Sequence, residues 1–171
     1  AADNVKQLVG VNPPIVLDPT LLLSKEQWLN LVRDEKRLVK GDYIFFYTLF
    51  ADPDRMNIVK RISEALGLPV VTSNFSNQYD VFNSFIKRYD AGPLDFLTLI
   101  RDAKLVVVSS FHGTVFSTLL NVPFFAIDGM SDARISTLLK TAGLENREIT
   151  TVNVEEKCKR SEERRVGKEC R

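Results

Sequence analysis

The feature that most constrains the fold is an unbroken aliphatic run, Leu105–Val108, which leads directly into the segment Ser109–Thr114. Four such residues in a row are typical of a strand buried on both faces of a parallel sheet. The small and hydroxylated residues that follow favour a tight turn and a helix N-cap. We therefore predict a strand that feeds a helix starting near Gly113, with His112, the only histidine of the chain, at the junction.

This junction suits an anionic ligand. The first turn of a helix presents backbone N–H groups and the positive end of the helix dipole, and the imidazole of His112 adds a titratable group. Ligands of open α/β sheets bind at the carboxyl ends of strands, which favours a ligand-binding role for His112. The alternative is a core histidine whose ring is hydrogen-bonded to a loop carbonyl.

The rest of the chain alternates between strand-like and helix-like patterns. We expect strands at residues 15–17, 43–49, 68–72, 105–109 and 122–128, and helices at 3–9, 24–32, 54–66, 94–103, 113–120 and 132–142. This alternation predicts an α/β fold, namely a Rossmann-like parallel sheet with flanking helices. The carboxyl ends of the strands then share one rim, and the dinucleotide and P-loop fingerprints are absent from the sequence.

The composition divides the chain into three parts. Residues 1–10 read as the end of a preceding helix or a linker, 11–154 as one domain, and 155–171 as a charged tail. The tail holds both cysteines and seven of the 23 basic residues, and we expect it to be disordered or foreign to the protein. We therefore expect no disulfide, metal site or nucleic-acid partner, and no apolar run approaches the ~20 residues of a transmembrane helix.

Several blocks together resemble the polysaccharide pyruvyl transferase family. The resemblance runs from about Val11 to Arg147 and is most specific around Ser110–Thr114. Its other blocks are Leu17–Leu23 followed by Trp28, Gly92-Pro93 with Phe96, Leu99-Ile100 and Ala103, Val107-Val108, Pro123-Phe124, and Arg134-Ile135 with Leu138-Leu139 ahead of Gly143-Leu144.

The resemblance implies transfer of a pyruvyl group from phosphoenolpyruvate to a sugar of an envelope or exported polysaccharide, forming a ketal. Phosphoenolpyruvate would be a donor substrate, with no separate cofactor, and the acceptor a saccharide or lipid-linked saccharide. Family members resemble two-domain GT-B enzymes, so this chain would be the C-terminal domain and an N-terminal domain its partner. The implied location is the cytoplasm, including the inner face of the membrane.

The resemblance also implies site residues. It associates Ser110, His112 and Gly113 with the donor, and some members have Arg-Leu where this chain has Ser110-Phe111. We expect His112 to act as a donor-binding cation or general acid, because the pKa of an imidazole lies near working pH. Phe111 belongs to the same block, and the Thr114 hydroxyl either binds an oxyanion or caps the helix.

Other rim residues are further candidates. Ser73 and Asn74 either contact the donor or form a polar turn, and Arg134 either binds phosphate or pairs with a neighbouring aspartate. Asp18 is expected to anchor the preceding segment through its Asp-Pro-Thr turn. Trp28 either packs or stacks on a sugar.

Two other functions share this fold. One is the donor domain of a nucleotide-sugar-dependent GT-B glycosyltransferase, which would use the same phosphate-binding turn. The other is a non-catalytic binding domain, because fold alone does not determine function.

Overall fold

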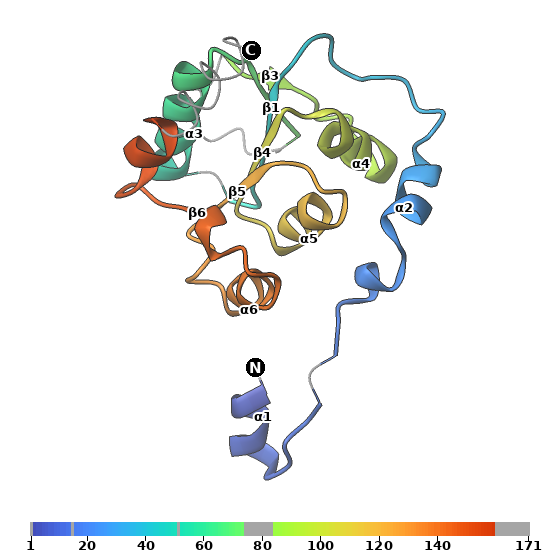
Figure 1. Cartoon of the computed structure of the whole chain (residues 1–171), viewed down its shortest axis with the longest axis vertical. Coiled ribbons are helices and arrows are strands. Elements are labelled where there is room, and N and C mark those ends of the chain that lie inside the picture. Colours follow the sequence, from blue (N-terminus) through green and yellow to red (C-terminus); the bar gives the residue numbers. More distant parts are fainter. Residues whose placement is uncertain (1, 15, 51, 74–83, 160–171) are drawn as a thin grey trace.

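A computed structural model describes residues 2–14, 16–50, 52–73 and 84–159 (Figure 1). Its centre is a six-stranded sheet in the order β3-β2-β1-β4-β5-β6, and every neighbouring pair is parallel. The predicted Rossmann-like α/β fold is thus confirmed. The strands are β1 Ile44–Tyr47, β2 Val70–Thr72, β3 Ile86–Lys87, β4 Leu105–Val108, β5 Phe124–Ile127 and β6 Glu148–Ile149.

The sheet has a topological switch point between β1 and β4: successive strands are added on one side of β1 up to β3 and on the other side from β4 onward. These two strands are neighbours in the sheet although β2 and β3 lie between them in sequence, and Tyr47 pairs with Val108 at their carboxyl ends. Open α/β sheets bind ligands at such a switch point, just beyond the carboxyl ends of the strands. The segment that contains His112 follows β4 directly.

Helices cover both faces of the sheet, with α4, α5 and α6 on one side and α3 on the other (Figure 1). Left-handed glycines, Gly67 and Gly143, end α3 and α6, and Ser24 and Gln27 form a capping box at the start of α2. The helices are α1 Ala2–Val9, η1 Pro19–Leu22, α2 Lys25–Leu31, α3 Pro53–Leu66, α4 Pro93–Asp102, α5 Phe111–Leu119, α6 Ala133–Ala142 and η3 Glu145–Arg147.

The side chains of β4 explain this two-layer cover. All four of its residues are buried, with Val106 and Val108 in the core beneath α4–α6 and Leu105 and Val107 in the core beneath α3. Successive residues of a strand point to opposite faces. An uninterrupted aliphatic run is therefore the pattern that a strand between two helical layers requires.

The prediction of a strand at residues 15–17 is wrong. Val16 and Leu17 lie in an extended segment outside the sheet, with exposed fractions of 80% and 67%, and residue 15 is outside the described residues. Prolines surround this segment at positions 13, 14 and 19. Proline has no N–H to donate to a neighbouring strand, so an apolar triplet between prolines is a poor candidate for the interior of a sheet.

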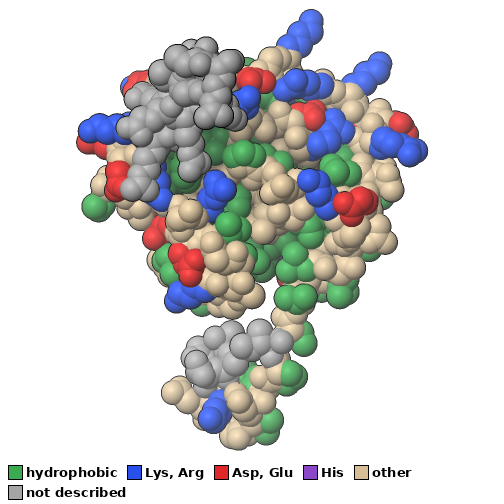
Figure 2. Space-filling model, viewed as in Figure 1, with side chains coloured by type: hydrophobic (Ala, Val, Ile, Leu, Met, Phe, Trp, Pro, Cys, Tyr) green, Lys and Arg blue, Asp and Glu red, His purple; other side chains and the backbone are tan. Residues whose placement is uncertain are grey.

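The chain before η1 forms an arm that stands away from the sheet. It carries α1, and its exposed hydrophobic side chains include Leu8, Val9 and Val11 (Figure 2). No helix in the described part of the chain is long and apolar enough to cross a lipid bilayer.

The fold continues into the segment expected to be a charged tail. Residues 154–159 are helical, Val154 is buried in the core beneath α3, and Cys158 packs against that core. An ion pair joins Arg61 of α3 to Glu155, with 2.9 Å between Nη1 and Oε1. The described structure therefore extends past the boundary expected at residue 154, whereas residues 160–171 lie outside it.

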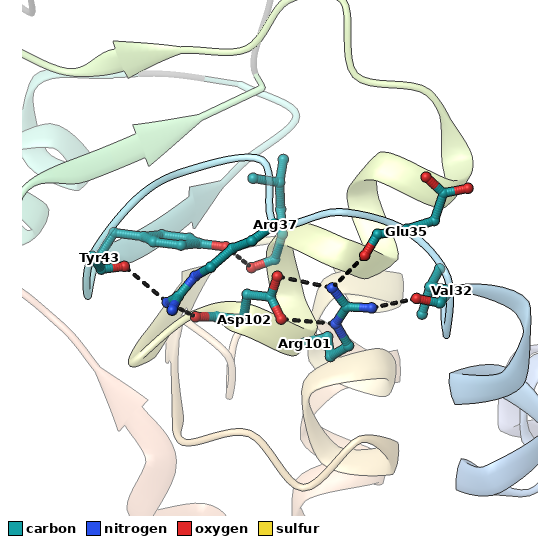
Figure 3. A network of polar contacts seen from close by, with 8 residues as sticks. Val32, Glu35, Arg37, Tyr43, Arg101 and Asp102 are labelled. Atoms are coloured by element: carbon teal, nitrogen blue, oxygen red, sulfur yellow. Dashed lines mark hydrogen bonds and ion pairs between the residues drawn. The ribbon is translucent and has the colours of Figure 1, made fainter.

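A polar network fastens the segment after α2 to the end of α4 (Figure 3). The Arg101 guanidinium forms a two-point ion pair with Asp102 and donates to the backbone carbonyls of Val32 and Glu35. Arg37 donates to the carbonyls of Gly41 and Asp102, at 2.8 and 3.1 Å. The network holds α2 and the preceding η1 segment against the domain.

Candidate active site

The turn after β4 delivers the start of α5 to the switch point. Ser110 is the N-cap residue, and the first helical hydrogen bond runs from the Thr114 N–H to the Ser110 carbonyl at 3.0 Å. The helix therefore begins at Phe111, two residues before the predicted start. The N–H groups of residues 111–113 precede the first helical bond, so the geometry leaves them for an external acceptor.

Gly113 lets α5 approach β4 closely. A Cβ atom on this residue would lie 2.8 Å from Cγ1 of Val108 and 3.4 Å from Cδ1 of Tyr47. The first distance is too short for any side chain. Glycine at this position therefore brings the positive end of α5 directly over the carboxyl end of β4.

The hydroxyl groups inside α5 serve the helix. Thr114 is fully buried, and its Oγ1 donates to the Ser110 carbonyl at 3.0 Å. Ser117 and Thr118 donate in the same way to carbonyls four residues earlier. Thr114 is thus not the helix cap, because the N-cap is Ser110, three positions before the expected helix start. The hydroxyl proton of Thr114 is engaged by the Ser110 carbonyl within the helix.

His112 lies on the surface at the second position of α5. Its side chain is 56% exposed, which excludes the alternative of a buried core histidine. Its Nε2 atom is 3.7 Å from Oδ2 of Asp18, the N-cap residue of η1. The histidine is therefore accessible to a ligand and lies beside a carboxylate.

The Asp18 carboxylate is fixed by its own turn. Oδ1 accepts hydrogen bonds from the Thr20 N–H at 3.0 Å and the Thr20 hydroxyl at 2.6 Å, which confirms the expected Asp-Pro-Thr turn. These two bonds hold the pKa of Asp18 below its usual range, and the positive charge of protonated His112 acts in the same direction.

Arg134 and Phe111 also lie at the start of α5. The Arg134 guanidinium carbon lies 5.3 Å from the centroid of the Phe111 ring, which is itself 5.4 Å from the His112 ring. Nη2 of Arg134 also lies 3.3 Å from Oδ2 of Asp132, so the ion-pair alternative is present in the structure. Arg134 therefore places a cation next to the segment Ser110–Thr114, and this cation is also paired with Asp132.

One expected candidate, Ser73, lies elsewhere on the rim. Ser73 follows β2, is buried, and lines a cavity of about 450 Å³ together with Trp28, Tyr47, Phe96 and Phe116. Trp28 packs edge-on against Phe116, with 4.9 Å between ring centroids, and also contributes to this aromatic cavity. Asn74 lies outside the described residues.

A second cavity of about 250 Å³ is polar and opens beside β4. Its walls include Arg55, Ser109, Asp128, Ser131 and Asp132. The backbone of Asp128 is left-handed, with φ of 50°, and burial raises the pKa of its carboxyl while Arg55 acts in the opposite direction. Strained backbone and perturbed acids are common at functional sites.

Arg55 and Asp128 were not among the predicted site residues. Arg55 lies in the first turn of α3, directly after β1, and its Nε is buried without a hydrogen-bond partner among the described residues. Asp128 follows β5. The signal that could have found Asp128 is its position directly after a buried strand, whereas Arg55 lies eight residues beyond the end of β1.

The described residues contain no group of three or more histidine, cysteine or acidic side chains able to hold a metal ion.

The model of one protein family, polysaccharide pyruvyl transferase, matches residues 2–129. The chain belongs to the polysaccharide pyruvyl transferase family. The match includes Asp18, Arg55 and His112, whereas Arg134 lies beyond it. No curated protein matches this family member. Family membership implies a transferase with a saccharide acceptor.

Proposed function

We propose that the chain is the donor-binding part of an enzyme that transfers the pyruvyl group of phosphoenolpyruvate to two hydroxyls of a saccharide, forming a ketal. The observation that carries the proposal is the exposed His112 beside the free N–H groups of α5, at the switch point of a member of this family. An anion-binding helix start and a titratable group are what this donor needs.

The reaction has a defined proton balance. The methylene carbon of phosphoenolpyruvate gains a proton and becomes the methyl group, two saccharide hydroxyls lose their protons and bond to the central carbon, and the bond to the phosphate oxygen breaks. Inorganic phosphate leaves with the remaining proton. A general acid is therefore needed at the carbon or at the departing phosphate, and we assign this role to His112 because its imidazole is exposed at the start of α5.

The donor has two anionic groups, and the site offers two kinds of positive partner. The N–H groups of residues 111–113 suit a phosphate or carboxylate, and the neighbouring Arg134 provides a guanidinium 5.3 Å from the Phe111 ring. Ser110 and Phe111 shape this turn. Ser73 and Asn74 are candidates for contacts from the end of β2.

The polar cavity beside β4 suits the acceptor. Asp128 and Ser131 offer a carboxylate and a hydroxyl that can hydrogen-bond to sugar hydroxyls, and the cavity is next to the β4–α5 turn through Ser109. An N-terminal α/β domain would complete the cleft, as in GT-B enzymes. A lipid-linked acceptor would place the enzyme at the inner face of the membrane.

Ligand-induced stabilisation separates this function from its competitor. We expect phosphoenolpyruvate to raise the unfolding temperature of the protein in a saturable way and UDP-glucose to leave it unchanged, because only a ligand of the native state stabilises it. Stabilisation by UDP-glucose alone would contradict the proposal and favour a nucleotide-sugar transferase.

Turnover separates it from a non-catalytic binding domain. In the enzyme with its N-terminal domain, His112→Ala should lower acceptor-dependent phosphate release by roughly 10²-fold or more. Lys60→Ala, at an exposed position of α3, serves as the control and should retain the wild-type rate. A His112→Ala variant with the wild-type rate would refute the proposed role.

A further inference from the structure

The η1–α2 segment contacts α5 at two points. Asp18 lies 3.7 Å from His112, and the Trp28 ring lies 4.9 Å from the Phe116 ring. His112 and Phe116 are four residues apart, so they occupy successive turns on one face of the helix. The segment therefore runs along the face of α5 that carries His112, instead of meeting it at one chance point.

Asp18 is held in one orientation by three linked hydrogen bonds. Its Oδ1 accepts from the N–H and the hydroxyl of Thr20, and the Thr20 carbonyl accepts from the Trp28 indole N–H at 2.9 Å. With Oδ1 engaged by the turn, Oδ2 is the oxygen that faces His112. The carboxylate is thus set in place before any ligand binds.

The start of α5 is an unfavourable place for a cation. His112 is the second residue of the helix, where the helix dipole favours negative charge and disfavours an imidazolium. The α6 side adds the Arg134 guanidinium above Phe111, its charge shared with Asp132. A general acid at this position needs a negative partner, and Asp18 supplies it from η1.

We propose that Asp18 is a positioning residue that holds the His112 ring through Nε2 and sets a negative charge beside it, leaving Nδ1 as the nitrogen that faces the ligand. The geometry of the pair is independent of the reaction. The assignment of Nδ1 to the donor rests on the proposed function.

The single histidine makes the pair directly measurable. The imidazole C–H resonances in an NMR spectrum of this chain come from His112 alone. In Asp18→Asn, which keeps an oxygen for Thr20 and loses the charge, we expect these resonances to move at constant pH, because the ring loses its charged neighbour. Asp34→Asn, at a 93% exposed carboxylate paired with Arg33, should leave the resonances in place.

A second variant separates charge from orientation. Thr20→Val removes the hydroxyl that holds Oδ1 and should move the resonances in the same direction by a smaller amount, whereas Thr20→Ser should leave them in place. Identical His112 resonances in the wild type and Asp18→Asn at the same pH would overturn the positioning role, whatever the enzyme's activity.

Activity then tests the link to catalysis. In the complete enzyme, Asp18→Asn should reduce kcat by roughly 10- to 100-fold with a smaller change in KM for phosphoenolpyruvate. Moved His112 resonances with an unchanged kcat would keep the ion pair and refute its catalytic role. Absence of phosphoenolpyruvate binding would refute the proposed function and leave the NMR result standing.

Discussion

Gly113 of α5 lies against Val108 of β4 so closely that a Cβ atom on the glycine would come 2.8 Å from the valine Cγ1. We expect Gly113→Ala to lower the free energy of unfolding by about 1–3 kcal/mol, because both partners belong to packed, buried elements. Denaturant unfolding measures this change directly.

A smaller side chain at position 108 should relieve the clash that Gly113→Ala creates and provides the control. Val108→Ala alone should destabilise the fold by removing buried methyl groups. Combined with Gly113→Ala, the total loss should be smaller than the sum of the two single losses, because each change makes room for the other. Strict additivity would show that the close approach of Gly113 and Val108 does not set the position of α5.

Asp128 is expected to cost the protein stability at neutral pH. Burial raises the pKa of its carboxyl, so the folded state disfavours the charged form. Asp128→Asn should raise the free energy of unfolding at pH 7, and asparagine also tolerates the left-handed φ of 50°.

The difference in unfolding free energy between Asp128→Asn and the wild type should depend on pH. Since the folded-state pKa is raised, the cost of the charge is complete above that pKa and vanishes below the unfolded value of about 4. The stability curves of Asp128→Asn and the wild type should therefore converge as the pH falls toward 3. A constant difference between the curves would assign the gain to asparagine geometry alone.

Asp132 has two separable roles at the start of α6. Oδ1 accepts from the N–H groups of Arg134 and Ile135, at 2.8 and 3.1 Å, while Oδ2 pairs with the Arg134 guanidinium. Asp132→Ala should lose about 0.5–2 kcal/mol in chemical denaturation because it removes the cap. Asp132→Asn keeps the cap and should lose well under 1 kcal/mol; equal losses in the two variants would contradict this division.

Arg134 should matter for the donor and little for the fold. Its side chain is exposed and lies over Phe111. Arg134→Ala in the complete enzyme should raise KM for phosphoenolpyruvate by roughly tenfold, the value of one charge-assisted contact, with little change in unfolding temperature. Arg33→Ala, at a similarly exposed arginine paired with Asp34, is the matched control; equal KM values for both variants would remove Arg134 from the donor site.

The sequence predicts the parts of the fold that depend on local pattern. The run Leu105–Val108 records a local constraint, and the buried strand that it predicts is confirmed. The capping box at Ser24 and the helix ends at Gly67 and Gly143 are local features of the same kind. The two-residue edge strands β3 and β6 are too short to show a periodic pattern, and they were missed.

The candidate site depends more on long-range contacts. The rim position of His112 follows from the strand before it, but Asp18 is 94 residues away in sequence, and only the path of η1 along α5 brings the two together. The same holds for Arg55 and Asp128, which come from the first turn of α3 and from the end of β5 and share one cavity. Local pattern identifies the rim, and the tertiary fold decides which rim residues meet.

The most direct test of the account is an NMR titration of the His112 imidazole with phosphoenolpyruvate, since this is the only histidine in the chain. We predict that its C–H resonances shift saturably with the donor, and that equal concentrations of UDP-glucose leave them in place. Phosphoenolpyruvate binding, measured in parallel by calorimetry, with unmoved His112 resonances would contradict a donor site at the start of α5.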